Sequence, residues 1–176
     1  MKESLVKKIE VFANVAIIVV ALVLAVVLVK KFVLTDSSQN KPKETVSVGS
    51  KINFEKVDWA KNGNTMLLVL SKDCRFCTES IPFYQKISQE IYQTNKVKLI
   101  TIFPQDTSTA KDYLQANNIS VDETFQANPS AIGVGGTPTI LLINDKGEIT
   151  NAWFGKLYEE EEKKVFERIR SISNAS

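Results

Sequence analysis

Residues 66–77 read MLLVLSKDCRFC, and this stretch decides the fold class of the chain. Residues 66–70 form a continuous apolar run, which is typical of a strand buried on both faces of a sheet. From residue 77 to about 92, apolar residues recur at spacings of three and four, which predicts a helix. Cys74 and Cys77 therefore lie where a buried strand turns into a helix.

The C-x-x-C pair at this junction favours thiol chemistry. The N-terminus of a helix has free N–H groups and the positive end of the helix dipole, so it stabilises an anion. A thiolate at Cys74 should have a lowered pKa, and the thiolate is the reactive form of cysteine. Arg75 adds positive charge beside it. Cys77, one turn later on the same face, is close enough to form a disulfide with Cys74 and should be less exposed.

Other uses of the two cysteines stay open at this point. They could form a static disulfide, although so short a loop would contribute little entropy, or they could be inert core residues. They could share a zinc ion across a dimer, since one chain has only two thiolates and no histidine. The absence of histidine excludes Ser-His-Asp and Cys-His catalysis, and a net charge of +2 gives no basic footprint for nucleic acid. We expect no metal, no cofactor and no nucleic-acid partner.

The remainder of the chain alternates between strand and helix patterns. Strands are predicted at 97–103, at 139–143, at 148–154 after a turn at 145–148, and briefly at 119–121. Helices are predicted from an N-cap at Thr107 or Ser108 to about residue 117, at 123–131 with an interruption near Pro129, and at 158–172. This order predicts an α/β fold with a central sheet flanked by helices.

Two prolines bear on the same region. Pro82 stands five residues after Cys77, inside the predicted helix, where it should kink the helix or mark a late start. Pro138 lies in the run GTPT at 136–139 and enters a predicted inner strand, where proline is uncommon. A cis Thr137–Pro138 bond would account for it, and an ordinary trans loop is the alternative.

Together these features resemble the thioredoxin superfamily over roughly residues 51–172. Pro138 follows Cys74 by sixty-four positions, more than in plain thioredoxin. In the length of this interval the chain resembles the membrane-tethered thiol–disulfide oxidoreductases of the TlpA-like class, which insert an extra helix and strand between these two positions. The resemblance implies a central mixed sheet flanked by helices. The resemblance implies that Cys74 is the attacking nucleophile and Cys77 the resolving thiol. It also implies that Pro138 is a cis-proline and that Thr137 lends backbone groups to a bound substrate chain.

Several positions depart from that pattern. Asp73 stands where an aromatic residue is usual, and its charge would oppose a thiolate on the first cysteine. Leu68 and Ser80 stand where thioredoxin and some TlpA-like relatives, respectively, carry an acid. The proton acceptor for the second cysteine is therefore unassigned, and Glu79 and Asp73 are carboxylates near it in sequence.

A composition break marks the N-terminal part. Residues 11–29 contain one polar member, Asn14, and no charge, and as a helix they would be about 28 Å long, close to the hydrocarbon thickness of a bilayer. A cleaved signal peptide is an alternative, but its apolar region is shorter and ends in a small-x-small site; a buried core helix rarely runs so long without a charge. We predict a tail at 1–10, a transmembrane anchor at 11–34, a flexible linker at 35–50 and a thioredoxin-like domain at 51–176.

The charges leave the orientation of this anchor ambiguous. Residues 1–35 carry a net charge of +3 and residues 36–176 a net charge of −1. The flanking lysines are Lys2, Lys7 and Lys8 before the span and Lys30, Lys31, Lys41 and Lys43 after it. The positive-inside rule is thus near a tie or leans towards a cytoplasmic C-terminus, but a long domain translocates largely regardless of charge. We predict a single-pass protein of the cell membrane with its domain outside the cytoplasm.

The expected function is reduction of protein disulfides by a membrane-tethered Cys74/Cys77 dithiol. Its partners would be a disulfide-containing protein substrate and a membrane or soluble electron donor. An alternative of another class is a membrane-anchored scaffold in which the two cysteines form an idle disulfide. A peroxiredoxin-like peroxidase is a further alternative, because Ser71 supplies the hydroxyl of that signature, although Leu67 replaces its proline.

Overall fold

The computed structural model describes residues 18–20, 24, 46–52 and 54–174. The helices are α2 (Trp59–Asn62), α3 (Arg75–Glu79), α4 (Ile81–Thr94), α5 (Thr107–Ala116), the 3₁₀ helix η1 (Pro129–Ile132) and α6 (Glu159–Asn174). The strands are β1 (Thr65–Val69), β2 (Lys98–Phe103), β3 (Glu123–Gln126), β4 (Thr139–Ile143) and β5 (Ile149–Phe154). They form one five-stranded sheet in the order β3-β2-β1-β4-β5.

The sheet is mixed, as predicted. Strand β1 lies at its centre and pairs in parallel with β2, which pairs in parallel with β3. On its other side β1 pairs antiparallel with β4, and β4 forms an antiparallel hairpin with β5. Every residue of β1 is buried, because a central strand covered on both faces has no side open to water.

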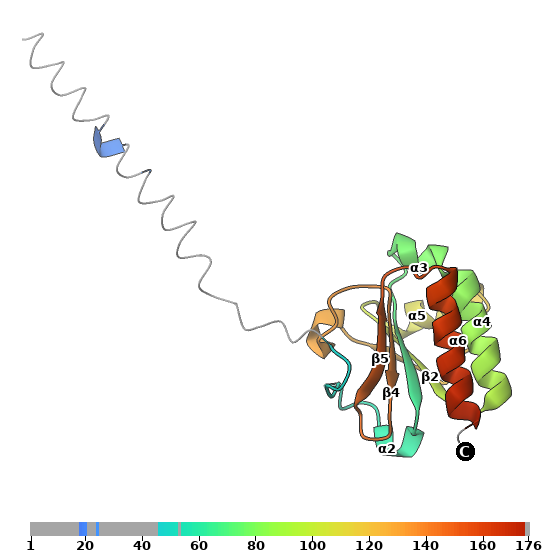
Figure 1. Ribbon diagram of the computed structural model, residues 1–176. Helices are drawn as coiled ribbons and strands as arrows, with labels where there is room; N and C mark the ends of the chain where they lie inside the picture. The colour runs from blue at the N-terminus through green and yellow to red at the C-terminus, as the bar shows by residue number, and fades with distance from the viewer. Residues whose placement is uncertain (1–17, 21–23, 25–45, 53, 175–176) are drawn as a thin grey trace, which may run out of the picture. The chain divides into compact units, whose positions relative to one another are not determined.

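Alternate residues of β1 contribute to two separate cores. Met66 and Leu68 pack with apolar side chains of α4, α5 and α6 on one face of the sheet. Figure 1 shows α4 and α6 side by side on this face. Leu67 and Val69 point to the opposite face, where Val46 and other residues of the segment before α2 join residues around η1. The two-residue period of the strand explains why a single apolar run supplies both cores.

The helix after the cysteines is broken, as Pro82 predicts. Helix α3 ends at Glu79, Ser80 is both its C-cap and the N-cap of α4, and Pro82 lies in the first turn of α4. Proline is accommodated there because the first N–H groups of a helix have no intrahelical partner. The break separates a short helix that carries the cysteines from the long helix that packs on the sheet.

Three local predictions were wrong. Residues 123–131 form β3 followed by η1 rather than one interrupted helix, and residues 119–121 form no strand. The cause is tertiary: β2 offers an open edge, and β3 pairs with it from Ile100↔Glu123 onward. The N-cap of α5 is Asp106, whose Oδ1 accepts a hydrogen bond from the Thr109 amide at 2.9 Å.

The N-terminal predictions fall mostly outside the described residues. The described residues exclude the whole predicted tail at 1–10, most of the predicted anchor at 11–34 and residues 35–45 of the predicted linker. Of the anchor, residues 18–20 and 24 are described, as exposed apolar positions in helix. Among the residues that the structure describes, no helix has both the length and the apolar character needed to cross a bilayer.

The end of the predicted linker packs against the sheet domain. The Val46 amide donates to the carbonyl of Gly133 at 3.0 Å, and the Gly49 amide donates to that of Ile149 at 2.8 Å. Val46 is buried, and so is Ile52 a few residues later. The folded part therefore includes residues 46–50, ahead of the boundary placed at residue 51.

Candidate active site

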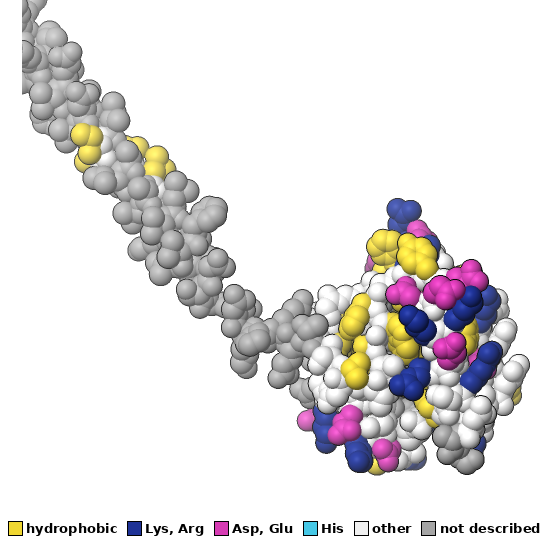
Figure 2. All heavy atoms as spheres, viewed as in Figure 1, with side chains coloured by type: hydrophobic (Ala, Val, Ile, Leu, Met, Phe, Trp, Pro, Cys, Tyr) yellow, Lys and Arg dark blue, Asp and Glu magenta, His cyan; other side chains and the backbone are white. Residues whose placement is uncertain are grey.

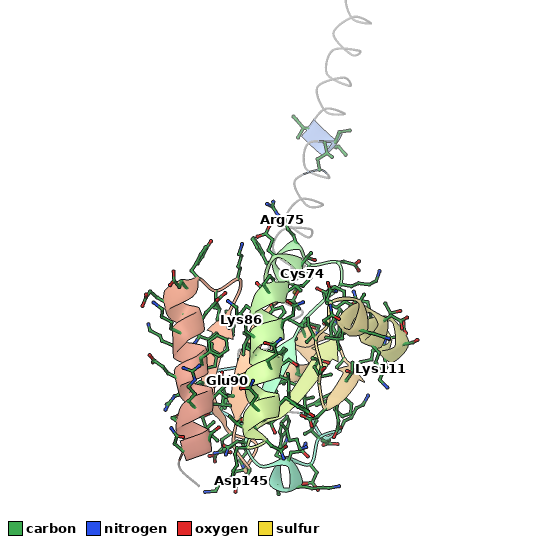
Figure 3. All side chains as sticks on the ribbon, turned by 90° about the vertical axis from the view of Figure 1, so that its right-hand side faces the viewer. Cys74, Arg75, Lys86, Glu90, Lys111 and Asp145 are labelled. Atoms are coloured by element: carbon green, nitrogen blue, oxygen red, sulfur yellow. The ribbon has the colours of Figure 1, made fainter. Side chains whose placement is uncertain are left out.

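Cys74 lies at the N-terminus of α3, at the carboxyl end of the central strand. It has an extended backbone and is the N-cap residue, with its Sγ 3.4 Å from the amide nitrogen of Cys77. Its own amide donates to the carbonyl of Ser71 at 3.2 Å, which closes the turn between β1 and α3. Figure 3 shows Cys74 at one end of the domain, opposite the hairpin end that carries Asp145.

The loop before β4 forms the other wall of the site. The Thr137–Pro138 bond is cis, as the resemblance implied, and Pro138 is buried. Cys74 Sγ donates to the carbonyl of Thr137 at 3.3 Å. The two loops meet because β4 runs antiparallel to β1, so that Thr139 at its start pairs with Val69 at the end of β1. The structure thus brings together both predicted cysteines and both predicted substrate-binding residues.

The environment of Cys74 lowers the pKa of its thiol. Partial burial acts in the opposite direction and raises the pKa, but hydrogen bonds to the sulfur outweigh it. They come from Thr137, from Cys77, whose amide nitrogen lies 3.4 Å from the sulfur, and from the backbone amide of Phe76. Donors at a helix N-terminus favour the thiolate over the thiol, which is the effect that the sequence predicted.

Cys77 is in a contrasting environment, one turn further into α3. It is 0% exposed, and this burial, with a hydrogen bond to Cys74 and the negative charge that forms there, raises its pKa to about 12. Both cysteines are free thiols in this structure. The pair therefore consists of an accessible sulfur that ionises readily and a hidden sulfur that stays protonated.

Phenols, not carboxylates, neighbour the buried thiol. Tyr84 is buried and Tyr113 partly so, and burial raises the pKa of each, with an additional electrostatic contribution from Cys77. Leu68 and Ser80, which replace the acids of the related patterns, are both buried here. None of the groups that chiefly set the pKa of Cys77 is a carboxylate. These contributions therefore assign no carboxylate as the proton acceptor for Cys77.

Arg75 projects away from the dithiol. Its side chain is 85% exposed, and its Nε lies 2.7 Å from Oε1 of Glu79. Figure 3 shows it at the outer end of the domain. Lys156, from the segment between β5 and α6, binds Oε2 of the same carboxylate at 2.9 Å. Hydrogen bonds from Lys156 and Arg75 lower the pKa of Glu79, so this carboxylate is engaged with two cations.

Gln105 belongs to the site although the sequence did not reveal it. Its Nε2 lies 3.0 Å from Ser71 Oγ and 3.0 Å from Asp73 Oδ2, both in the turn that leads to Cys74. Gln105 follows β2 by two residues, and β2 is the parallel neighbour of β1. Because the carboxyl ends of parallel strands meet at one edge of the sheet, its position after β2 was the available signal.

The chain is similar to known proteins in its structure. No protein-family model matches the chain, and no curated protein does. A thioredoxin domain of a thiol-disulfide oxidoreductase from Bacteroides vulgatus superposes with a TM-score of 0.54 at 12% identity, over 70% of this chain and 98% of that one. The fold is thioredoxin-like.

Two further solved structures share this thioredoxin-like fold. A proposed thiol:disulfide interchange protein DsbE from Chlorobium tepidum matches with a TM-score of 0.57 at 15% identity, over 73% of this chain and 99% of that one. A thiol-disulfide isomerase from Corynebacterium glutamicum matches with a TM-score of 0.51 at 19% identity, over 74% and 96% of the two chains. Between Cys74 and Pro138 the chain forms α3, α4, β2, α5, β3 and η1, so that a further helix and strand, α5 and β3, follow β2 before the cis-proline loop.

Proposed function

We propose that the chain is a thiol–disulfide oxidoreductase that reduces protein disulfides with Cys74 and Cys77. The observation that carries this proposal is the contrast between the two sulfurs of one helical turn. Cys74, partly exposed, is held at the start of α3 opposite Thr137, and Cys77 is buried behind it. The solved structures described above as interchange or oxidoreductase proteins support the same class of reaction.

The reaction consists of two exchanges. The Cys74 thiolate attacks one sulfur of a substrate disulfide; an S–S bond forms between chain and substrate, and the other substrate sulfur leaves as a thiolate that takes up a proton. Cys77 then gives up its proton and attacks Cys74 Sγ, which releases the second substrate sulfur. The substrate gains two electrons and two protons, and the chain is left with a Cys74–Cys77 disulfide. An external dithiol donor restores the reduced pair.

The surface beside Cys74 suits a protein substrate. Phe76, between the two cysteines, is 52% exposed, although it is large and apolar. Figure 2 shows hydrophobic side chains exposed at the end of the domain where α3 lies in Figure 1. An apolar contact next to the nucleophile would hold a polypeptide in place while the exchange proceeds.

Insulin reduction tests the proposal. The full-length protein, in mild detergent with dithiothreitol as donor, should accelerate precipitation of the insulin B chain. Cys74→Ser should abolish the acceleration, because it removes the attacking sulfur. Cys77→Ser should lower the rate, because it removes the resolving thiol. In a separate reaction of the pre-reduced variant without dithiothreitol, insulin should stay joined to Cys74, detectable on a non-reducing gel. Gln89→Ser, at an exposed position of α4, is the matched control and should keep the full rate. Equal rates for all four proteins would refute the proposal.

We further propose that residues 11–34 anchor the protein in the cell membrane with the domain outside the cytoplasm. The anchor is supported by the uncharged apolar run at 11–29 with lysines on both flanks. The flanking charges do not decide the orientation, which is proposed because the anchor is joined to an activated C-x-x-C pair. The protein should stay with the membrane fraction after an alkaline carbonate wash, and protease added outside intact, wall-free cells should degrade the domain. Release by carbonate would contradict the anchor. Protection from protease would contradict the orientation and leave the thiol chemistry untouched.

A further inference from the structure

The turn before the nucleophile contains an acid whose charge opposes the reaction. Asp73 precedes Cys74 directly, and a carboxylate near a thiolate raises the pKa of the thiol. Nevertheless, the Cys74 sulfur contacts the Cys77 amide at 3.4 Å and the Thr137 carbonyl at 3.3 Å, and no carboxylate is among the groups that chiefly set its pKa. The position of the Asp73 side chain therefore matters for the site.

Gln105 holds that side chain from a neighbouring strand end. Its Nε2 donates to Asp73 Oδ2 at 3.0 Å and to Ser71 Oγ at 3.0 Å, and the Asp73 amide also donates to Ser71 Oγ at 3.2 Å. Lys72, in the same turn, lies 3.4 Å from the other carboxylate oxygen. The orientation of the amide follows from its partners, because an amide oxygen aimed at a carboxylate would be repelled.

We propose that Gln105 is a positioning residue of the dithiol site, which ties the Asp73 carboxylate to the β2 end of the sheet and away from Cys74 Sγ. Sγ faces the opposite wall, where Thr137 lies at 3.3 Å. The Gln105 side chain is partly buried, and its Oε1 has no hydrogen-bond donor among the described residues, so the contacts of this amide are made by its NH₂ group. Gln105 thus acts on the nucleophile through Asp73 and does not touch the substrate.

This role of Gln105 rests on the proposed function for its biological meaning. Its test, however, measures only the reactivity of the Cys74 thiol and needs no substrate. Gln105→Met in the reduced full-length protein keeps the side-chain length and removes the donor. The pH profile of Cys74 alkylation by iodoacetamide, followed on the Cys74 peptide by mass spectrometry, should move to higher pH. At a pH below the thiol pKa the rate should fall about threefold, the size expected when a unit charge in water approaches to within several ångströms.

The decisive comparison repeats Gln105→Met in a protein from which the Asp73 charge has been removed. With Asp73→Asn in the background, Gln105→Met should leave the pH profile of Cys74 unmoved. Gln126→Met is the matched control, since the Gln126 amide also contacts this loop, at the carbonyl of Pro104, without reaching Asp73. It should not move the profile. Gln105→Asn, which is one methylene shorter and cannot reach both acceptors, should shift the profile in the same direction and serves if Gln105→Met does not fold.

An unchanged profile in both Gln105 variants would overturn the proposal. So would an equal shift in the Asp73→Asn background, because Gln105 would then act on the shape of the turn and not on the charge. Failure of the proposed function would look different. Insulin would not be reduced by the unaltered protein, whatever the alkylation profiles of its variants.

Discussion

Two identical thiols acquire opposite properties from their places in one helical turn. Cys74 is at the helix N-terminus among donors, and Cys77 is in the apolar core three residues later. The sequence predicted this contrast because helix geometry is local. It did not predict the contacts of Asp73 with Gln105 or of Glu79 with Lys156, since these join residues 32 and 77 positions apart. Only the strand order and the packing of loops bring such pairs together.

Alkylation at several pH values should separate the two cysteines. The pKa of Cys74 is lowered, so its thiolate fraction, and with it the rate, should persist at a pH where an ordinary cysteine is protonated. Cys77 has a pKa raised to about 12 and is buried, so it should stay unmodified near neutral pH. The measurement is iodoacetamide labelling of the reduced protein with mass spectrometry of each cysteine peptide. In urea both rates should converge, and similar rates in the folded protein would contradict the assignment.

The strands differed in how far their own residues determined that they would be strands. The strands at β1, β2 and β4 were predictable, because long apolar or β-branched runs suit only a buried sheet. Strand β3 was not: Glu123–Gln126 is short and only partly buried, and its conformation depends on the open edge of β2. The wrong prediction at 123–131 thus came from a segment whose structure is decided by a partner distant in sequence.

Both faces of the sheet carry apolar side chains that other segments of the chain must bury. Helices α4, α5 and α6 cover one face, and the other is covered in part by Val46, Ile52 and further apolar residues ahead of β1. The polar composition of residues 36–50 did not distinguish a free linker from a segment with one buried side chain. Burial of Val46 was therefore visible only in the three-dimensional structure.

Val46 and Val48 give a matched test of that cover. Val46 is 7% exposed and packs against the sheet, whereas Val48 is 63% exposed. Val46→Ala should lower the free energy of unfolding by about 1–2 kcal/mol, because it removes buried apolar surface and leaves a small cavity. Val48→Ala should change it by less than about 0.5 kcal/mol. Urea unfolding of the full-length reduced protein, followed by tryptophan fluorescence, measures both. A loss for Val46→Ala no larger than that for Val48→Ala would contradict the stabilising role assigned to the burial of Val46.

Complete burial of Cys77 has a consequence for the order of events in the proposed exchange. When the pair is oxidised, only one of its two sulfurs can be approached from outside, so an electron donor has to attack the same atom that the substrate used. Donor and substrate therefore compete for one face of the molecule and occupy it in turn. Substrate and donor therefore cannot bind at the same time: the reduced substrate must dissociate before the donor can reduce the Cys74–Cys77 disulfide. A donor that dissociates slowly should act as a competitive inhibitor of the substrate.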